Sequence, residues 1–138
     1  MSLAPILISS PYTLLYFYPK DDTPGCTLEA QDFTRLVPDF AKLGIQIIWV
    51  SRDSESSHAK FCNKYDLGIQ LISDEDDSLH KQFGVIGEKK NYGKVYIGVI
   101  RSTFLLDSTW KIRHEWMNVK ATGHAEKVLR EVKIELFK

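Results

Sequence analysis

Hydrophobic positions form two nearly unbroken runs in the first third of the chain, Tyr12–Tyr18 and Ile45–Val50. Runs of this length and composition are typical of strands that are buried on both faces of a sheet. Between them, four apolar residues recur at the spacing of one helical face. They are Phe33, Leu36, Val37 and Phe40. A helix is therefore predicted here, with Pro38 inside it, where a proline can kink a helix, and with Gly44 at its end.

The segment before this helix carries the signals of a helix start. Thr23 is a favourable N-cap residue, and Pro24 suits the first helical position. A strand, a helix and a second strand then follow in order. Such a unit places its two strands in parallel through a right-handed crossover, so a βαβ unit is predicted.

A second helix is predicted after the second strand, with Asp53 or Ser54 as its N-cap. Three of its residues fall on one side: Phe61, Cys62 and Tyr65. A short strand at Ile69–Ile72 and a short helix at Asp77–Phe83 are expected next. The stretch Gly84–Gly93 is polar and rich in glycine, so it is expected to be a loop.

The last part of the chain predicts antiparallel strands and a closing helix. Tyr96–Leu106 is predicted to be one strand, which residues 107–110 turn into a second strand at Lys111–Trp116. Five apolar residues at helical spacing mark the final helix: Ala125, Val128, Leu129, Val132 and Leu136. Together these elements predict an α/β fold with a mixed central sheet flanked by helices.

The composition is that of a globular protein of 138 residues, 43% of them hydrophobic and 26% charged. The 18 basic and 18 acidic side chains balance, which argues against a broad basic surface for nucleic acid or for an anionic membrane. No run approaches the roughly 20 apolar residues of a membrane helix, and the mildly apolar start, Met1–Ile8, lacks the basic residues of a signal peptide. A single domain of residues 1–138 is expected, in the cytoplasm with reduced thiols.

Cys26 is the candidate for chemistry. If Thr23 caps the helix, Cys26 lies in the first turn, where backbone N–H groups have no partner within the helix. These donors and the positive end of the helix dipole favour a thiolate over a thiol. The residues alone leave a second interpretation open, namely a small buried cysteine without reactivity. The two cysteines and four histidines lack the spacing of a zinc site, so no metal is expected.

The residues around Cys26 resemble the signature of the peroxiredoxins, in which a proline, a threonine and a cysteine follow at fixed spacing. Pro19, Thr23 and Cys26 occupy these positions, and Thr-Pro-Gly-Cys-Thr is similar to the bacterioferritin-comigratory-protein or PrxQ branch. The likeness continues in the same order along the chain from Tyr12 onward. Its further segments are residues 50–54, 71–74, 87–94, 101–107 and 123–126. This resemblance implies a thioredoxin-like fold and a thiol-dependent peroxidase.

By this resemblance, Cys26 is the peroxidatic nucleophile, which attacks a hydroperoxide and becomes a sulfenic acid. Thr23 matches the threonine that hydrogen-bonds the thiolate and the peroxide. Arg101 matches the arginine that stabilises the thiolate and the leaving oxygen, and a charge within an apolar strand needs a partner in any case. Glu29 matches the acid that orients this arginine, and Pro19 matches the proline that shields the sulfur from water.

Cys62 is the expected resolving cysteine, which would form an intramolecular disulfide with Cys26. The commonest PrxQ pattern places that cysteine five positions after the first, where this chain has Gln31, so a disulfide within one helix is ruled out. A second pattern of the branch places it on the following helix, at about the separation found here. Because a disulfide requires Cα atoms within about 7 Å, one or both helix starts would have to unwind in part. A core cysteine beside Phe61 and Tyr65 is the alternative.

The resemblance also implies partners. A hydroperoxide is the expected substrate, thioredoxin or a similar dithiol is the expected reductant, and no metal, haem or flavin is expected. A monomer or weak homodimer is expected, with a leader shorter than is usual for the family, since about eleven residues precede Tyr12. Two alternatives remain: a one-cysteine peroxidase with an inert Cys62, and a thioredoxin-fold module that senses peroxide and passes the oxidation to a partner. A thiol–disulfide oxidoreductase is disfavoured because the chain has no Cys-x-x-Cys.

Overall fold

The computed structural model describes residues 11–136 except 92, 110 and 118–122. Five strands form one mixed sheet in the order β3-β2-β1-β6-β7. They are β1 (Tyr12–Phe17), β2 (Ile45–Ser51), β3 (Gln70–Ser73), β6 (Ser102–Asp107) and β7 (Ile112–Trp116). Since β1 pairs in parallel with β2 and antiparallel with β6, the predicted βαβ unit and mixed sheet are confirmed. The expectations for Met1–Ile8 and Trp110 lie outside the described residues.

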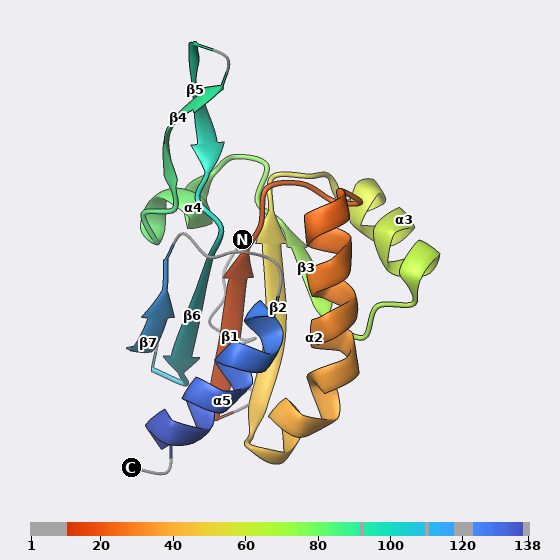
Figure 1. Ribbon diagram of the computed structural model, residues 1–138, viewed down its shortest axis with the longest axis vertical. Helices are drawn as coiled ribbons and strands as arrows, with labels where there is room; N and C mark the ends of the chain where they lie inside the picture. The colour runs from red at the N-terminus through yellow and green to blue at the C-terminus, as the bar shows by residue number, and fades with distance from the viewer. Residues whose placement is uncertain (1–10, 92, 110, 118–122, 137–138) are drawn as a thin grey trace.

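The described residues include four helices beside the sheet: α2 (Pro24–Lys42), α3 (Glu55–Tyr65), α4 (Ser78–Gln82) and α5 (His124–Leu136). In Figure 1, α2 and α5 cover one face of the sheet, and α4 lies on the other. α2 begins and ends close to its predicted limits, with Pro38 inside it and Gly44 after it. The N-cap of α3 is Ser54, whose side chain accepts from the backbone N–H of Ser57, rather than Asp53.

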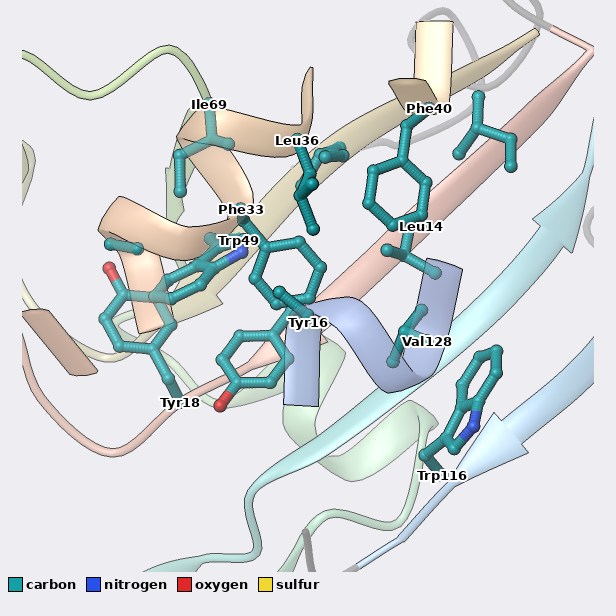
Figure 2. Close-up of a cluster of buried hydrophobic side chains, with 14 of the residues drawn as sticks. Leu14, Tyr16, Tyr18, Phe33, Leu36, Phe40, Trp49, Ile69, Trp116 and Val128 are labelled. Atoms are coloured by element: carbon teal, nitrogen blue, oxygen red, sulfur yellow. The ribbon is translucent and has the colours of Figure 1, made fainter. Parts of the chain in front are cut away.

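The core divides into two clusters because successive residues of a strand point to opposite faces. In β1, Leu14 and Tyr16 enter the cluster beneath α2 and α5, whereas Leu15 and Phe17 enter the cluster on the opposite face. Figure 2 shows the first cluster, to which α2 contributes the predicted face. Of that face, Phe33, Leu36 and Phe40 are buried and Val37 is half-buried. Burial of each large apolar side chain contributes about 1.5–3 kcal/mol to stability.

The stretch 84–93 is not a loop, so that prediction was wrong. β4 (Ile86–Asn91) and β5 (Lys94–Val99) form an antiparallel two-stranded ribbon, which projects from the central sheet in Figure 1. Gly93 in the turn has a φ of +77°, which a residue without a side chain adopts at little cost. Val95 and Ile97 on the ribbon are exposed. After Ile86 the sequence of β4 is polar or glycine, so it lacks the alternation that would have identified this strand.

The predicted single strand Tyr96–Leu106 is also two strands. β5 ends at Val99 and β6 begins at Ser102, and between them the backbone N–H of Ile100 donates to the carbonyl of Val85 at 2.7 Å. This break was not predicted, because apolar residues lie on both sides of it. The break places Arg101 between the ribbon and the central sheet.

The remaining predictions agree closely with the structure. β3 begins one residue later than expected, the β6–β7 hairpin forms, and α5 buries Ala125, Val128 and Val132. Among the described residues, no helix has both the length and the apolar character needed to cross a bilayer.

Candidate active site

Cys26 lies at the start of α2, as predicted. Thr23 is at the N-cap position in an extended conformation, and Cys26 is the third residue of the helix. The first turn of a helix presents backbone N–H groups that have no partner within the helix. The side chain of Thr23 does not cap these groups, because its hydroxyl donates instead to the carbonyl of Lys20 at 3.1 Å. The N-cap prediction is therefore right for the backbone of Thr23 and wrong for its side chain.

Arg101 reaches Cys26 from a distant part of the chain. Its Nη2 donates to Sγ of Cys26 at 3.2 Å, and its Nη1 donates to the hydroxyl of Tyr16 at 3.0 Å. The planar guanidinium can bind both partners at once. Arg101 thus places a permanent positive charge next to the sulfur of Cys26.

Glu29 is fully buried one helical turn after Cys26, with its Oε2 3.6 Å from Nη1 of Arg101. Neither carboxyl oxygen has a partner of good hydrogen-bond geometry among the described residues. Burial raises the pKa of Glu29 to about 8, and the charge of Arg101 and the nearby hydroxyl of Tyr16 oppose this rise without cancelling it. The carboxyl group is therefore largely neutral at pH 7, and it does not compete with a Cys26 thiolate for the guanidinium.

Tyr16 is a member of this cluster that the sequence analysis did not identify. Its side chain is fully buried, and Figure 2 shows its hydroxyl at the margin of the apolar cluster. Burial raises the pKa of Tyr16 well above 10, so the hydroxyl stays protonated and can accept from Arg101 through its lone pairs. The sequence could have pointed to Tyr16, because it lies in a strand predicted to be buried on both faces and a buried tyrosine hydroxyl usually has a hydrogen-bond partner.

His124, at the start of α5, adds a neutral ring to the same region. Its centroid lies 5.8 Å from that of Tyr16, and its Nε2 lies 2.8 Å from Oγ1 of Thr103. Burial lowers the pKa of His124 to about 4, so the ring carries no charge at neutral pH. Arg101 is thus the charged group at the sulfur, and His124 supports the packing of Tyr16.

The side chain of Cys26 is completely buried. A hydroperoxide therefore reaches Sγ only when residues around the first turn of α2 move aside. Pro19, which was predicted to shield the sulfur, follows β1 in the loop that leads to this turn and is itself exposed.

Cys62 is on α3 and is half-buried. It lines a groove of about 380 Å³ between α3 and β3, together with Ala59, Leu71 and Ile72. Burial raises the pKa of Cys62, so its thiol is protonated at neutral pH. Both cysteines are free thiols in this structure, with Cys26 bound to Arg101 and Cys62 facing the groove.

The described residues contain no group of three or more histidine, cysteine, aspartate or glutamate side chains arranged to hold a metal ion. Two histidines instead form buried pairs with single carboxylates. Nδ1 of His58 lies 2.7 Å from Asp21, and Nδ1 of His80 lies 2.6 Å from Asp74.

Comparison with known proteins gives matches over most of the chain. Residues 3–115 match the AhpC/TSA family. The chain is 48% identical to peroxiredoxin Bcp of Xanthomonas campestris over 122 residues, which cover 88% of this chain and 76% of the relative. It is 46% identical to peroxiredoxin Bcp of Bacillus subtilis, with 88% of this chain and 78% of the relative covered.

Solved structures agree with these matches. The bacterioferritin comigratory protein of X. campestris, studied for its alkyl peroxide reduction activity, superimposes with a TM-score of 0.84 at 46% identity, covering 89% of this chain and 78% of that protein. Two structures of X. campestris peroxiredoxin Q each carry serine at one of two cysteines, whose positions differ by 36, as do those of Cys26 and Cys62. Both superimpose with a TM-score of 0.85 at 47% identity, covering 89% of this chain and 78% of that protein. The chain therefore belongs to the AhpC/TSA family and, within it, to the Bcp/PrxQ peroxiredoxins, which are thiol-dependent peroxidases.

Proposed function

We propose that this protein reduces hydrogen peroxide and organic hydroperoxides with Cys26 as the peroxidatic nucleophile. The observation that carries the proposal is the 3.2 Å contact between Nη2 of Arg101 and a sulfur in the first turn of α2. The Cys26 thiolate attacks the terminal oxygen of ROOH, and the O–O bond breaks. The sulfur becomes a sulfenic acid, and the alkoxide takes up a proton and leaves as an alcohol.

The residues of the peroxiredoxin motif around Cys26 each have a proposed part in this step. Arg101 stabilises the thiolate before the attack and the negative charge on the leaving oxygen as the O–O bond breaks. Thr23 donates its proton to Lys20, so its oxygen keeps lone pairs that can accept a hydrogen bond from the peroxide. By the family resemblance, Glu29, with Oε2 3.6 Å from Nη1 of Arg101, orients the guanidinium, and Pro19 shields the sulfur from water.

Resolution of the sulfenic acid is assigned to Cys62. Its sulfur attacks that of Cys26, a disulfide forms, and the hydroxyl leaves as water with the thiol proton. Because Cys26 is bound to Arg101 and Cys62 faces the groove, the first turn of α2 or part of α3 must open for the two to meet. A dithiol such as thioredoxin then reduces the disulfide and is itself oxidised. The proposed setting is the cytoplasm, and the proposed assembly of this single domain is a monomer or weak homodimer, without a metal, haem or flavin.

The test combines rapid kinetics with two serine variants. One equivalent of hydrogen peroxide should consume the reduced Cys26 of the wild-type protein far faster than it consumes free cysteine, and a Cys26–Cys62 disulfide should follow. Cys26→Ser should be inert, and Cys62→Ser should accumulate a sulfenic acid that dimedone traps, with loss of thioredoxin-supported turnover.

Each alternative gives a different result. A rate no greater than that of free cysteine would remove the peroxidase assignment of Cys26. Unchanged turnover in Cys62→Ser would establish the one-cysteine mechanism. Weak turnover with a stable mixed disulfide to another protein would favour the sensing module.

Tyr16→Phe is expected to slow the oxidation of Cys26 by about tenfold. The change removes the hydroxyl that accepts from Nη1 of Arg101 and keeps the ring in its place in the core. A hydrogen bond to a charged group contributes about 1.5–3 kcal/mol, part of which the guanidinium recovers by shifting toward Glu29. Stopped-flow fluorescence with hydrogen peroxide measures the rate. Tyr12→Phe, at the other end of β1, is the matched control, and equal rates in both variants would show that Tyr16 does not position Arg101.

A further inference from the structure

Asp21 is a buried carboxylate in the loop between β1 and α2. It accepts three side-chain hydrogen bonds: from the hydroxyl of Tyr18 at 2.5 Å, from the hydroxyl of Ser57 at 2.8 Å and from Nδ1 of His58 at 2.7 Å. Ser57 and His58 belong to the first half of α3. Asp21 thus binds the segment that leads into the helix of Cys26 to the helix that carries Cys62.

The contacts of His58 favour the charged form of its ring. Nδ1 faces the carboxylate of Asp21, and Nε2 lies 3.1 Å from the carbonyl oxygen of Ile72 in β3. Both partners can accept, so the imidazolium form, which has a proton on each nitrogen, satisfies both contacts at once. Burial alone would lower the pKa of His58, but the hydrogen bond and the charge of Asp21 raise it. The donors around Asp21, His58 first among them, likewise lower the pKa of Asp21 despite its burial.

A second contact lies on the other side of Cys62. Asp22 accepts from Nζ of Lys64 at 2.8 Å and from the hydroxyl of Tyr65 at 2.5 Å. Asp22 has a φ of +57°, a left-handed conformation that aspartate tolerates better than most residues. Since Asp22 and Lys64 are exposed, this contact contributes less than the buried one. The loop before Cys26 is therefore bound to α3 one helical turn before Cys62 and again just after it.

We propose that the buried ion pair between His58 and Asp21 is a clamp that holds the first turn of α2 against α3, and that its release limits the movement of oxidised Cys26 toward Cys62. The inference rests on the proposed function for the role of Cys62. His58 is a positioning residue, because it acts on the sulfur of Cys26 through Asp21. In the reduced enzyme the clamp keeps Cys26 beside Arg101. After oxidation it must open before the disulfide can form.

The clamp predicts a pH dependence with a definite sign. Below the raised pKa of His58, the imidazolium donates to both Asp21 and the carbonyl of Ile72. As the pH rises through that pKa, one nitrogen becomes an acceptor that faces an oxygen, so the clamp weakens and disulfide formation accelerates. The other titratable groups that face His58 are Tyr18 before α2, Asp53 before α3, and Glu55 and Cys62 on α3. Deprotonation of Cys62 also accelerates resolution, and this contribution remains when His58 is replaced.

The test variant is His58→Gln, whose amide can donate to Asp21 or to Ile72 but not to both. The matched control is His80→Gln, because His80 forms a similar buried pair with Asp74 but lies on α4, on the opposite face of the sheet. Rapid-quench mass spectrometry after one equivalent of peroxide should show disulfide formation about tenfold faster in His58→Gln and within about twofold of wild type in His80→Gln. When the rate of disulfide formation is plotted against pH, wild type and His80→Gln should show the step caused by the titration of His58. His58→Gln should lack this step.

Amide hydrogen exchange in the reduced proteins provides a readout that needs no disulfide. The amides in the first turn of α2 should exchange about tenfold faster in His58→Gln than in wild type. Their exchange rate in His80→Gln should equal that of wild type. Equal protection in all three proteins would overturn the clamp, and faster exchange with an unchanged rate of disulfide formation would overturn its control of resolution. If the wild type forms no Cys26–Cys62 disulfide, the role of Cys62 in the proposed function fails, whereas the exchange data still decide whether the pair holds α2. Should His58→Gln not fold, Asp21→Asn removes the charge of the same pair and is measured in its place.

Discussion

Replacing Arg101 with methionine is expected to slow the oxidation of Cys26 by hydrogen peroxide by about 100- to 1,000-fold, the usual cost of removing one preorganised donor from a site of developing charge. Two losses are expected together, because Nη2 of Arg101 contacts the sulfur and, in the proposed reaction, its charge also stabilises the leaving oxygen. Methionine has a similar length and no charge. The loss should therefore appear in the second-order rate constant with peroxide rather than in the later disulfide step.

Two further variants separate charge from geometry. Arg101→Lys keeps the positive charge but cannot bind Cys26 and Tyr16 together, so it should recover only part of the rate. Arg113→Met, on the exposed side of β7, is the control for a lost arginine and should react like wild type. If stopped-flow traces placed Arg101→Met within tenfold of wild type, Arg101 would have no major part in the reaction.

Glu29→Gln is expected to change the dependence of stability on pH. The pKa of Glu29 is about 8 in the folded protein and has an ordinary value of 4.5. Between these values the folded chain retains a proton that the unfolded chain has released, so stability falls as the pH rises, by about 1.4 kcal/mol per unit. Glutamine cannot ionise, and it removes this slope. Relative to wild type, the variant should therefore gain roughly 3 to 4 kcal/mol on going from pH 5 to pH 8, because the slope flattens near each pKa.

Urea denaturation of the reduced proteins at pH 5, 6.5 and 8 measures this difference. The comparison uses the change in the free energy of unfolding with pH, because the loss of the contact with Arg101 lowers the stability of Glu29→Gln by a constant amount. Glu115→Gln, an exposed residue of β7, provides the control. Parallel curves for wild type and Glu29→Gln would show that Glu29 is ionised in the folded protein and that Arg101 outweighs its burial.

The elements that lie against the core could be predicted from the sequence, because burial determines where their apolar residues fall. The helical spacing on α2 and the unbroken apolar runs of β1 and β2 were such patterns, and these elements lie within about one residue of their predicted positions. The β4–β5 ribbon has no such constraint, because it extends away from the core and its backbone pairing does not depend on which residues are apolar. The break at Ile100 and Arg101 is set by where the chain leaves the ribbon, which is a tertiary property.

The residues of the candidate site likewise fall into two groups, those that a local sequence pattern identifies and those that only the fold brings together. Pro19, Thr23 and Cys26 are close in sequence, so a short motif and the rules of helix starts identified them together. Arg101 came from the family resemblance, and the structure shows why its charge is tolerated among apolar neighbours. The contacts of Tyr16 with Arg101 and of Asp21 with His58 join distant segments, and no local pattern marks either pair.

The burial of Cys26 also determines which reagents can consume it. A hydroperoxide presents a slender oxygen pair at its end, with any alkyl tail trailing outside, whereas an alkylating agent must bring a bulkier tetrahedral carbon up to the same sulfur. With Cys26 as the proposed nucleophile, a small opening of the first turn of α2 is therefore expected to admit a hydroperoxide before it admits an alkylating agent.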